Sequence, residues 1–276
     1  LQLIGGRADL EPERARSWSV TADFHPRSVS GLRVEVSYFD TRYTDRIVVP
    51  ILFSSQALSN PIYADQVTLA PGVDAVAQTI AGAGQFFNVS GLAFDPARVV
   101  AIVDNTNVNA ATQRVRGVDG AVTFDTELEG GAGRVTAALY ASYLRSSQRL
   151  TPAQPEQPLA GRLFNPPHWR ARGELGWSAG LVGLTGAVNY TGGVTDPRFA
   201  APRDVRGMTT LDLAARLVSP EERGVAKGLD VVLSVQNVLN AKPDTITNTL
   251  LYDNPYDSTN YSPIGRFVAI SVSKSW

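Results

Sequence analysis

The stretch that decides the fold is Trp169–Thr191, WRARGELGWSAGLVGLTGAVNYT. In the first half of this stretch, apolar or small residues alternate with mostly charged residues. The turn Ala179–Gly180 separates this half from a second half, in which apolar residues also alternate with small or polar ones. The apolar series are Trp169, Ala171, Gly173, Leu175 and Trp177, then Val182, Leu184, Val188 and Tyr190. Strict alternation predicts two β-strands with one apolar and one polar face. Each half is long enough to cross a membrane as a tilted strand.

Similar alternation recurs in seven other segments, so the sequence predicts about nine strands. They are residues 18–24, 32–38, 118–125, 134–147, 211–217, 229–235 and 265–276. The segment 134–147 alternates less cleanly than the others. In the last segment Val268, Ile270 and Val272 share one face, and the aromatic Trp276 closes the chain. We expect this strand to complete a barrel wall, with Trp276 at the lipid interface.

The connections between these segments have two different lengths, which alternate along the chain. The short ones are residues 26–31, 129–133, 179–180 and 219–228, and the long ones are 49–112, 148–168, 192–207 and 241–262. Membrane β-barrels have short periplasmic turns at one end and long extracellular loops at the other. A soluble sandwich gives no reason for loop lengths to sort by end. The sequence therefore predicts an antiparallel up-and-down transmembrane β-barrel.

Aromatic residues on the apolar face support the same fold, because they fall near the strand ends. Trp18, Tyr38, Trp169 and Tyr190 belong to the outer ends, and Phe24, Phe124, Trp177 and Trp276 to the inner ends. At about 3.3 Å per residue, Trp169 and Trp177 lie roughly 27 Å apart along the strand. With a tilt of about 40 to 45° this covers roughly 20 Å of depth, which suits two aromatic girdles around an apolar band.

The composition restricts the possible functions. The chain has 276 residues with a formal net charge of −1, which gives no sign of a nucleic-acid partner. It has no cysteine and only two histidines, His25 and His168, which are far apart, so we expect no disulfide and no metal site. No motif of a hydrolase, metalloprotease or phosphate-binding enzyme is present, and we expect neither catalysis nor a cofactor.

Candidate ligand contacts come from the polar face and from the last long loop. Arg170 and Asn189 occupy polar positions of the strands on either side of Ala179–Gly180, and they would face the inside of the barrel. Tyr252, Tyr256 and Tyr261 lie in the last long connection among Asn and Asp residues. Such loops suit sugars or siderophores, but they also suit ordinary loop packing. In the first long connection, Pro71 could open a short helix through residues 73–80.

Several segments resemble the TonB-dependent outer-membrane receptors, in the order in which that family has them. Ile4–Arg16 (IGGRADLEPERAR) is similar to the family's GG-N-P-x-L-x-P-E segment, although Ala8 replaces the usual proline. Val36–Val48 (VSYFDTRYTDRIV) and Gln113–Phe124 (QRVRGVDGAVTF) resemble two of its strands. Leu233–Asp244 (LSVQNVLNAKPD) resembles the end of its penultimate strand, and residues 265–276 resemble its C-terminal strand.

The resemblance implies more than the residues themselves. Such receptors have a barrel of about 22 strands filled by an N-terminal plug, and a coupling protein pulls on an N-terminal box. Residues 1–276 would be the C-terminal part of the barrel, without plug or box. The implied function is energised uptake of a scarce nutrient, such as a siderophore, vitamin or oligosaccharide, in the bacterial outer membrane. The implied partners are membrane lipid, the TonB-type coupling protein, the small nutrient and the barrel-assembly machinery. That machinery would recognise Val268, Ile270, Val272 and Trp276.

Other functions stay open at this point. A passive porin-like channel would share the barrel, and finding a plug domain and a coupling box in the parent polypeptide would exclude it. A barrel-embedded outer-membrane enzyme would need a catalytic residue pair near the rim, and His168 is the histidine placed to serve. A soluble β-sandwich adhesin is a further alternative. In that case the apolar side chains of Leu213, Leu233 and Trp177 would be sealed between two sheets.

Overall fold

The computed structural model describes residues 1–151, 154–219, 224, 226–248 and 254–275. The chain forms two compact units. The first comprises Leu1–Arg16, Arg42–Arg114 and Gln148–Gln157, and the second comprises Ser17–Thr41, Val115–Ser147 and Pro158–Trp276. None of the helices among the described residues is long and apolar enough to cross a membrane.

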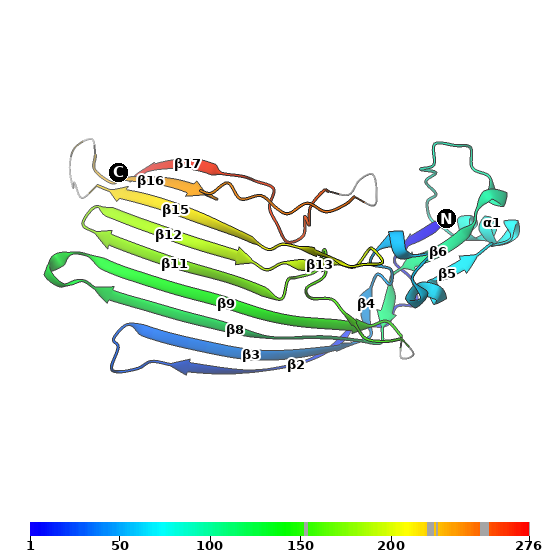
Figure 1. Ribbon diagram of the computed structural model, residues 1–276, viewed down its shortest axis with the longest axis horizontal. Helices are drawn as coiled ribbons and strands as arrows, with labels where there is room; N and C mark the ends of the chain where they lie inside the picture. The colour runs from blue at the N-terminus through cyan, green and yellow to red at the C-terminus, as the bar shows by residue number, and fades with distance from the viewer. Residues whose placement is uncertain (152–153, 220–223, 225, 249–253, 276) are drawn as a thin grey trace. The chain divides into compact units, whose positions relative to one another are not determined.

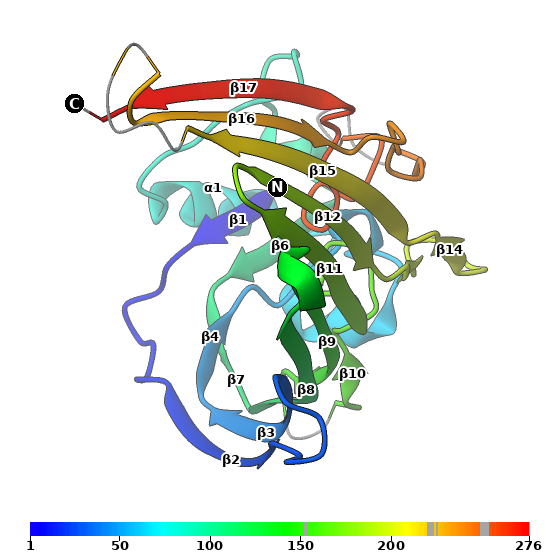
Figure 2. The ribbon, with the colours of Figure 1, turned by 90° about the vertical axis from the view of Figure 1, so that its left-hand side faces the viewer.

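Nine long strands follow one another in a single sheet, in the order β17-β16-β15-β12-β11-β9-β8-β3-β2 (Figure 1). They are β2 (Arg14–Phe24), β3 (Leu32–Thr44), β8 (Thr112–Glu127), β9 (Arg134–Arg149), β11 (Trp169–Ala179), β12 (Val182–Thr191), β15 (Met208–Val218), β16 (Leu229–Gln236) and β17 (Phe267–Lys274). A two-residue strand, β10 (Gln157–Pro158), also pairs with β9. The predicted all-β fold of about nine antiparallel strands is confirmed. Among the described residues the sheet is curved and has β2 and β17 as its two edge strands (Figure 2).

Short turns join consecutive strands at one end of this sheet. The turn between β11 and β12 has Gly180 at φ 53°, and the turn between β2 and β3 ends at Gly31 with φ 83°. A side chain at Gly31 would collide with the backbone carbonyl of Asp125 on the neighbouring strand β8. Both turns therefore need glycine, for backbone conformation and in one case for space as well. Gly31 and Gly180 therefore explain why the chain reverses direction at the two turns predicted from the sequence.

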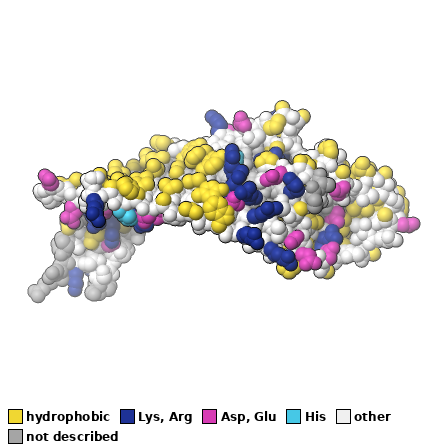
Figure 3. Space-filling view, turned by 90° about the horizontal axis from the view of Figure 1, so that it is seen from below, with side chains coloured by type: hydrophobic (Ala, Val, Ile, Leu, Met, Phe, Trp, Pro, Cys, Tyr) yellow, Lys and Arg dark blue, Asp and Glu magenta, His cyan; other side chains and the backbone are white. Residues whose placement is uncertain are grey.

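The apolar face of the sheet is uncovered. Leu213 and Leu233 are each 46% exposed, and Trp177 is 36% exposed, so none of them is sealed between two sheets. Figure 3 shows hydrophobic side chains gathered on the surface of the strands. Aromatic rings meet on this face near the ends opposite the short turns, with Trp18 5.2 Å from Tyr38 and Tyr143 4.7 Å from Trp169 between centroids. Exposed apolar patches of this kind mark protein–protein or membrane interaction sites, which fits the expected lipid contact.

The first unit has a small core of its own. Ile51, Ala57 and Tyr63 are buried together, and Ile62 and Val103 pack against them. The helix α1 (Val73–Ala81) confirms the short helix expected after Pro71. The other elements are β1 (Gln2–Gly5), β4 (Arg46–Val48), η1 (Ser54–Gln56), η2 (Pro61–Gln66), β5 (Val67–Leu69), η3 (Pro96–Arg98), β6 (Ala101–Thr106) and β7 (Val108–Ala110).

The sheet of the first unit was not predicted from the sequence. Strand β6 lies between β1, to which it runs parallel, and β5, to which it runs antiparallel. A separate pair is formed by β4 and β7. The first long connection therefore folds as a compact structure rather than as a plain loop.

Candidate functional site

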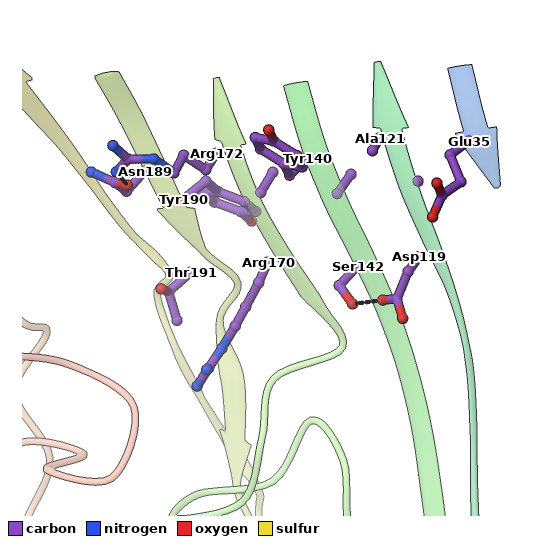
Figure 4. Close-up of a pocket in the computed structure, with 13 residues that line it drawn as sticks. Glu35, Asp119, Ala121, Tyr140, Ser142, Arg170, Arg172, Asn189, Tyr190 and Thr191 are labelled. Carbon is purple, nitrogen blue, oxygen red and sulfur yellow. Dashed lines mark hydrogen bonds between the residues drawn. The ribbon is translucent and has the colours of Figure 1, made fainter. Parts of the chain in front are cut away.

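A shallow pocket lies on the polar face of the sheet in the second unit, across the strands β3, β8, β9, β11 and β12 (Figure 4). Its volume is about 420 Å³. The polar residues that line it are Glu35, Asp119, Tyr140, Ser142, Arg170, Arg172, Asn189 and Thr191. Because residues of equal phase along a strand point to one side, these groups share the face opposite the exposed apolar residues.

The pocket wall on β11 and β12 is held by a chain of hydrogen bonds. Arg172 donates to the side-chain oxygen of Asn189 and, at 2.9 Å, to Glu174. The amide nitrogen of Asn189 donates to Asp212 at 2.8 Å, and Asp212 in turn accepts from the backbone N–H of Asn237 at 2.8 Å. The register explains the contacts, since Arg172 lies opposite Asn189. This network fixes the orientation of the amide and the guanidinium before any ligand arrives.

Arg170 extends from the pocket toward the last long loop. Its guanidinium donates to the side-chain oxygen of Asn260 at 3.1 Å. On the opposite wall the hydroxyl of Ser142 donates to Asp119. The pocket thus presents arginines on one side and the carboxylates of Asp119 and Glu35 on the other. Such a surface can bind a polar ligand that carries both anionic and hydrogen-donating groups.

The loops beyond the pocket are ordered by buried polar groups. Asp257 is fully buried and accepts hydrogen bonds from the backbone N–H of Phe164, at 3.2 Å, and from the Asn260 amide, at 2.8 Å. Tyr261 is 4% exposed, and its hydroxyl donates to the carbonyl of Gly192 at 2.7 Å. Burial raises the pKa of Tyr261 to about 12. Three separate connections are therefore joined to one another.

The loop that follows β12 contains a short hairpin, β13 (Val194–Asp196) and β14 (Arg203–Val205). Arg198, between these strands, pairs with Asp196 and also donates to the carbonyl of Thr247 in the last loop. Nothing in the alternation of the sequence indicates this pair, because its residues lie in an irregular connection.

The sequence-predicted ligand contacts separate into three groups. Arg170 and Asn189 both line the pocket, so the structure brings them together. Tyr261 is buried and bonded within the loops, and Tyr256 is half-buried beside Asp257 in sequence. Tyr252 lies outside the described residues. The arrangement of Tyr261 is that of a residue that packs loops.

The predicted assembly residues lie on the strand β17. Val268, Ile270 and Val272 are exposed and share the apolar phase with Leu233, which lies opposite Ile270. Trp276 lies outside the described residues.

The three polar pocket residues on β8 and β9, which are Asp119, Tyr140 and Ser142, were not named as candidates from the sequence. The alternation in residues 134–147 is too irregular to assign Tyr140 to a face. The pairing with β11 settles it, because Tyr140 lies opposite Arg172 and Ser142 opposite Arg170. The face on which Tyr140 and Ser142 lie was therefore indicated by the clear alternation of β11 and not by the alternation of β9 itself.

His168 is held in a structural environment. Its Nδ1 is 2.7 Å from the carbonyl oxygen of Leu144, and its ring stacks on Tyr143 at 5.9 Å between centroids. A side chain at Gly161 would collide with the same imidazole ring. These contacts of His168 are those of a residue that holds the loop in place, and none of them points to a catalytic role. Among the residues that the structure describes, no three His, Asp or Glu side chains are grouped as metal ligands.

Comparison with known proteins identifies what the fold is similar to. The sequence pattern of a family described as TonB dependent receptor-like, beta-barrel, matches residues 2–238. A comparison with curated protein sequences gives no match.

Solved structures cover nearly the whole chain. The siderophore receptor PirA from Acinetobacter baumannii has a TM-score of 0.60 at 12% identity, and the match covers 99% of this chain and 33% of PirA. The FrpB iron transporter from Neisseria meningitidis has a TM-score of 0.53 at 16% identity, with 98% and 32% covered. The copper transporter OprC has a TM-score of 0.53 at 11% identity, with 98% and 32% covered. The chain thus spans about a third of the length of these structures.

Proposed function

This chain belongs to the TonB-dependent receptor-like β-barrel family, and from that membership we propose that it forms the C-terminal part of the barrel of an energised nutrient importer. Proteins of the family are receptors and transporters in the outer membrane of Gram-negative bacteria, and that is where the chain is located. In this proposal residues 1–276 are one segment of a longer barrel. The plug and the coupling box belong to other parts of the same polypeptide.

The observation that carries the proposal is the opposite character of the two faces of one sheet. Leu213 and Leu233 on one face suit contact with membrane lipid, whereas Arg170, Arg172 and Asn189 on the other face surround a pocket. A wall with lipid on one side and an aqueous lumen on the other has this arrangement. A small polar nutrient would reach the pocket from the loop end, where Arg170 already contacts Asn260.

The proposed substrate is a small metal chelate. Two of the similar structures are named as iron or copper transporters, and another is named as a ferric enterobactin receptor from Pseudomonas aeruginosa. The oxygen-rich surface of an anionic chelate would be recognised by Arg170 and by the hydroxyl of Tyr140, in the pocket that Asn189 also lines. Tyr256 in the loop is a further candidate contact, and Tyr252 stays a candidate on sequence grounds. Tyr261, whose hydroxyl is bonded to the carbonyl of Gly192, would contribute by ordering the loops around the ligand.

The proposed partners follow from the membrane location. Lipid would cover the exposed apolar face, and a TonB-type protein would supply the energy through the N-terminal part of the polypeptide. The barrel-assembly machinery would recognise the final strand through Val268, Ile270, Val272 and Trp276. The exposure of the three described residues on one phase of β17 supports this assignment.

The test is an uptake assay with the full-length receptor that contains this chain. A strain that lacks the receptor is given ferric enterobactin, ferric citrate or a Cu(II) chelate as the limiting metal source, and metal accumulation is measured. We expect the receptor to restore accumulation of at least one chelate only when the coupling protein is present. Accumulation that does not depend on the coupling protein would show a passive channel instead. Absence of accumulation for every chelate would contradict the proposed substrate class.

A further inference from the structure

Among the described residues, the pocket in the second unit is lined by one charge of each sign that no ion pair includes. The charged residues that line it are Glu35, Asp119, Arg170 and Arg172. Arg172 pairs with Glu174 at 2.9 Å. Glu35 pairs with Arg33 at 2.9 Å, although Arg33 also binds Asp23. These two lining charges are therefore held within ion pairs, and one group of each sign is left for a ligand.

The two remaining groups are Arg170 and Asp119, and the partner of each is a neutral group. The Arg170 guanidinium donates to the side-chain oxygen of Asn260 at 3.1 Å. The Asp119 carboxylate accepts from the hydroxyl of Ser142 (Figure 4). In the part of the chain that the structure describes, no cationic side chain pairs with Asp119 and no carboxylate pairs with Arg170. A ligand can therefore bind either group without breaking an ion pair.

The pairing of the strands places these two residues in one row across the polar face. Arg170 on β11 lies opposite Ser142 on β9, and Ser142 is bonded to Asp119 on the next strand, β8. Neighbouring strands are about 4.8 Å apart, so the backbones of Arg170 and Asp119 are roughly 10 Å apart. The Arg170 side chain extends toward Asn260 and not toward Asp119. The pocket thus holds a positive and a negative group at its two ends, with the hydroxyl of Ser142 between them.

The acidic half of the pocket also has an aromatic ring. Tyr140 lies on the same face of β9 as Ser142, opposite Arg172, and is 46% exposed. Figure 4 shows its ring between Arg172 and the small side chain of Ala121. An accessible ring near a carboxylate suits a protonated amine, which the carboxylate attracts by its charge and the ring attracts through its negative face.

We propose that the pocket selects chelates that carry a protonated amine at a distance from their anionic metal-binding oxygens. In this arrangement Arg170 binds the oxygens, and the amine lies between Asp119 and the Tyr140 ring. A free amino acid is too short for both contacts, because its two charges flank a single carbon atom. The inference rests on the proposed function and narrows the substrate class of the same pocket.

The test uses two synthetic ferric tris-catecholates that differ only at the end of one pendant chain. In one chelate the chain ends in a primary amine, and in the other the amine is N-acetylated and uncharged. Equilibrium binding of both chelates to the purified full-length receptor is measured for the wild type and for Asp119→Asn. Asp125→Asn is the matched control, because Asp125 lies on the same face of β8 but pairs with Arg134 and does not line the pocket.

We expect the wild type to bind the amine chelate at least about tenfold more tightly than the acetylated one, since a charge-assisted hydrogen bond contributes roughly that factor or more. Asp119→Asn should remove this preference, and Asp125→Asn should retain it. Equal affinity of the wild type for the two chelates would overturn the inference, as would a preference that persists in Asp119→Asn. Equal affinity combined with uptake that depends on the coupling protein would leave the proposed function standing.

A second pair of probes separates this inference from the proposed substrate class. Triglycine and N-acetyltriglycine carry no metal, and only triglycine has an ammonium group at the end opposite its carboxylate. If neither chelate binds, the proposed substrate class is contradicted. A preference for triglycine that Asp119→Asn removes would then still support the amine site. Equal binding of the two peptides, or binding of neither, would overturn it.

Discussion

Arg198 and Asp196, which are only two positions apart in the sequence, form a buried bidentate ion pair. Their side chains are 2% and 3% exposed. The Nε and Nη2 atoms of Arg198 each donate to a different carboxylate oxygen of Asp196, both at 2.9 Å, and Nη2 also donates to the Thr247 carbonyl at 2.9 Å. The pair thus joins the loop after β12 to the last loop, beyond the pocket.

Replacing Arg198 with leucine should loosen both loops. The change leaves the Asp196 carboxylate buried without its partner, which costs about 3 to 5 kcal/mol. We expect faster hydrogen exchange in residues 192–207 and 254–262, measured on the full-length receptor.

Arg203→Leu is the control for this change, because exposed Arg203 contacts the Phe199 ring and the hydroxyl of Thr247 on the surface. Its effect should be below about 1 kcal/mol. Equal exchange in the wild type and the Arg198 variant would show that the pair does not hold the loops.

The Tyr261 hydroxyl should report loop closure at alkaline pH. Its pKa is raised to about 12, whereas an unfolded tyrosine titrates near about 10. A raised folded-state pKa means that this contribution to stability is present below about pH 10 and is lost as the pH rises through about 12. The difference in tyrosinate absorbance between wild type and Tyr261→Phe, followed against pH, isolates this residue. A midpoint near 10 in the difference curve would place the hydroxyl in water and contradict the buried contact with Gly192.

Replacing Arg170 should weaken chelate binding while leaving the barrel intact. Arg170→Gln removes a charged donor at the loop end of the pocket, and a hydrogen bond to a charged group contributes about 1.5 to 3 kcal/mol. We therefore expect the dissociation constant of the transported chelate to rise by roughly 10- to 100-fold. Equilibrium binding to the purified full-length receptor measures this.

Arg216→Gln serves as the control for the pocket, since Arg216 pairs with Asp230 on the polar face and does not line the pocket. Its binding should stay within about twofold of the wild type, because a mostly exposed ion pair contributes little. If Arg170→Gln bound the chelate as tightly as the control, the pocket would not be the binding site.

The main sheet could be predicted from the sequence because a membrane wall imposes a simple rule on each strand. The alternation in Trp169–Ala179 assigns every side chain to a face, and glycine marks the turn at Gly180. The same rule placed Arg170 and Asn189 on the polar side. It failed for Tyr140, whose strand alternates weakly, because only the pairing with Arg172 fixes its face.

The loops could not be predicted in the same way. The pairing of β1 with β6 joins residues about a hundred positions apart, and no local periodicity specifies such a contact. Likewise the burial of Asp257 and Tyr261 depends on partners contributed by two other connections, Phe164 and Gly192. The aromatic and polar composition of the last loop fits both ligand contact and loop packing. Only its partners in the folded structure show that Tyr261 packs between loops.

We infer that one face of the sheet meets hydrocarbon and that the other meets water. Residues 1–276 contain no cysteine, so a cysteine spin label at Leu213 or Leu233 on one face, or at Asp212 or Ser234 on the other, is unique within this chain. In the full-length receptor in lipid vesicles, the accessibility of each label to oxygen and to a water-soluble nickel chelate is measured. We expect oxygen access to dominate at Leu213 and Leu233 and access of the nickel chelate to dominate at Asp212 and Ser234. Nickel access at Leu213 and Leu233 equal to that at Asp212 and Ser234 would contradict it.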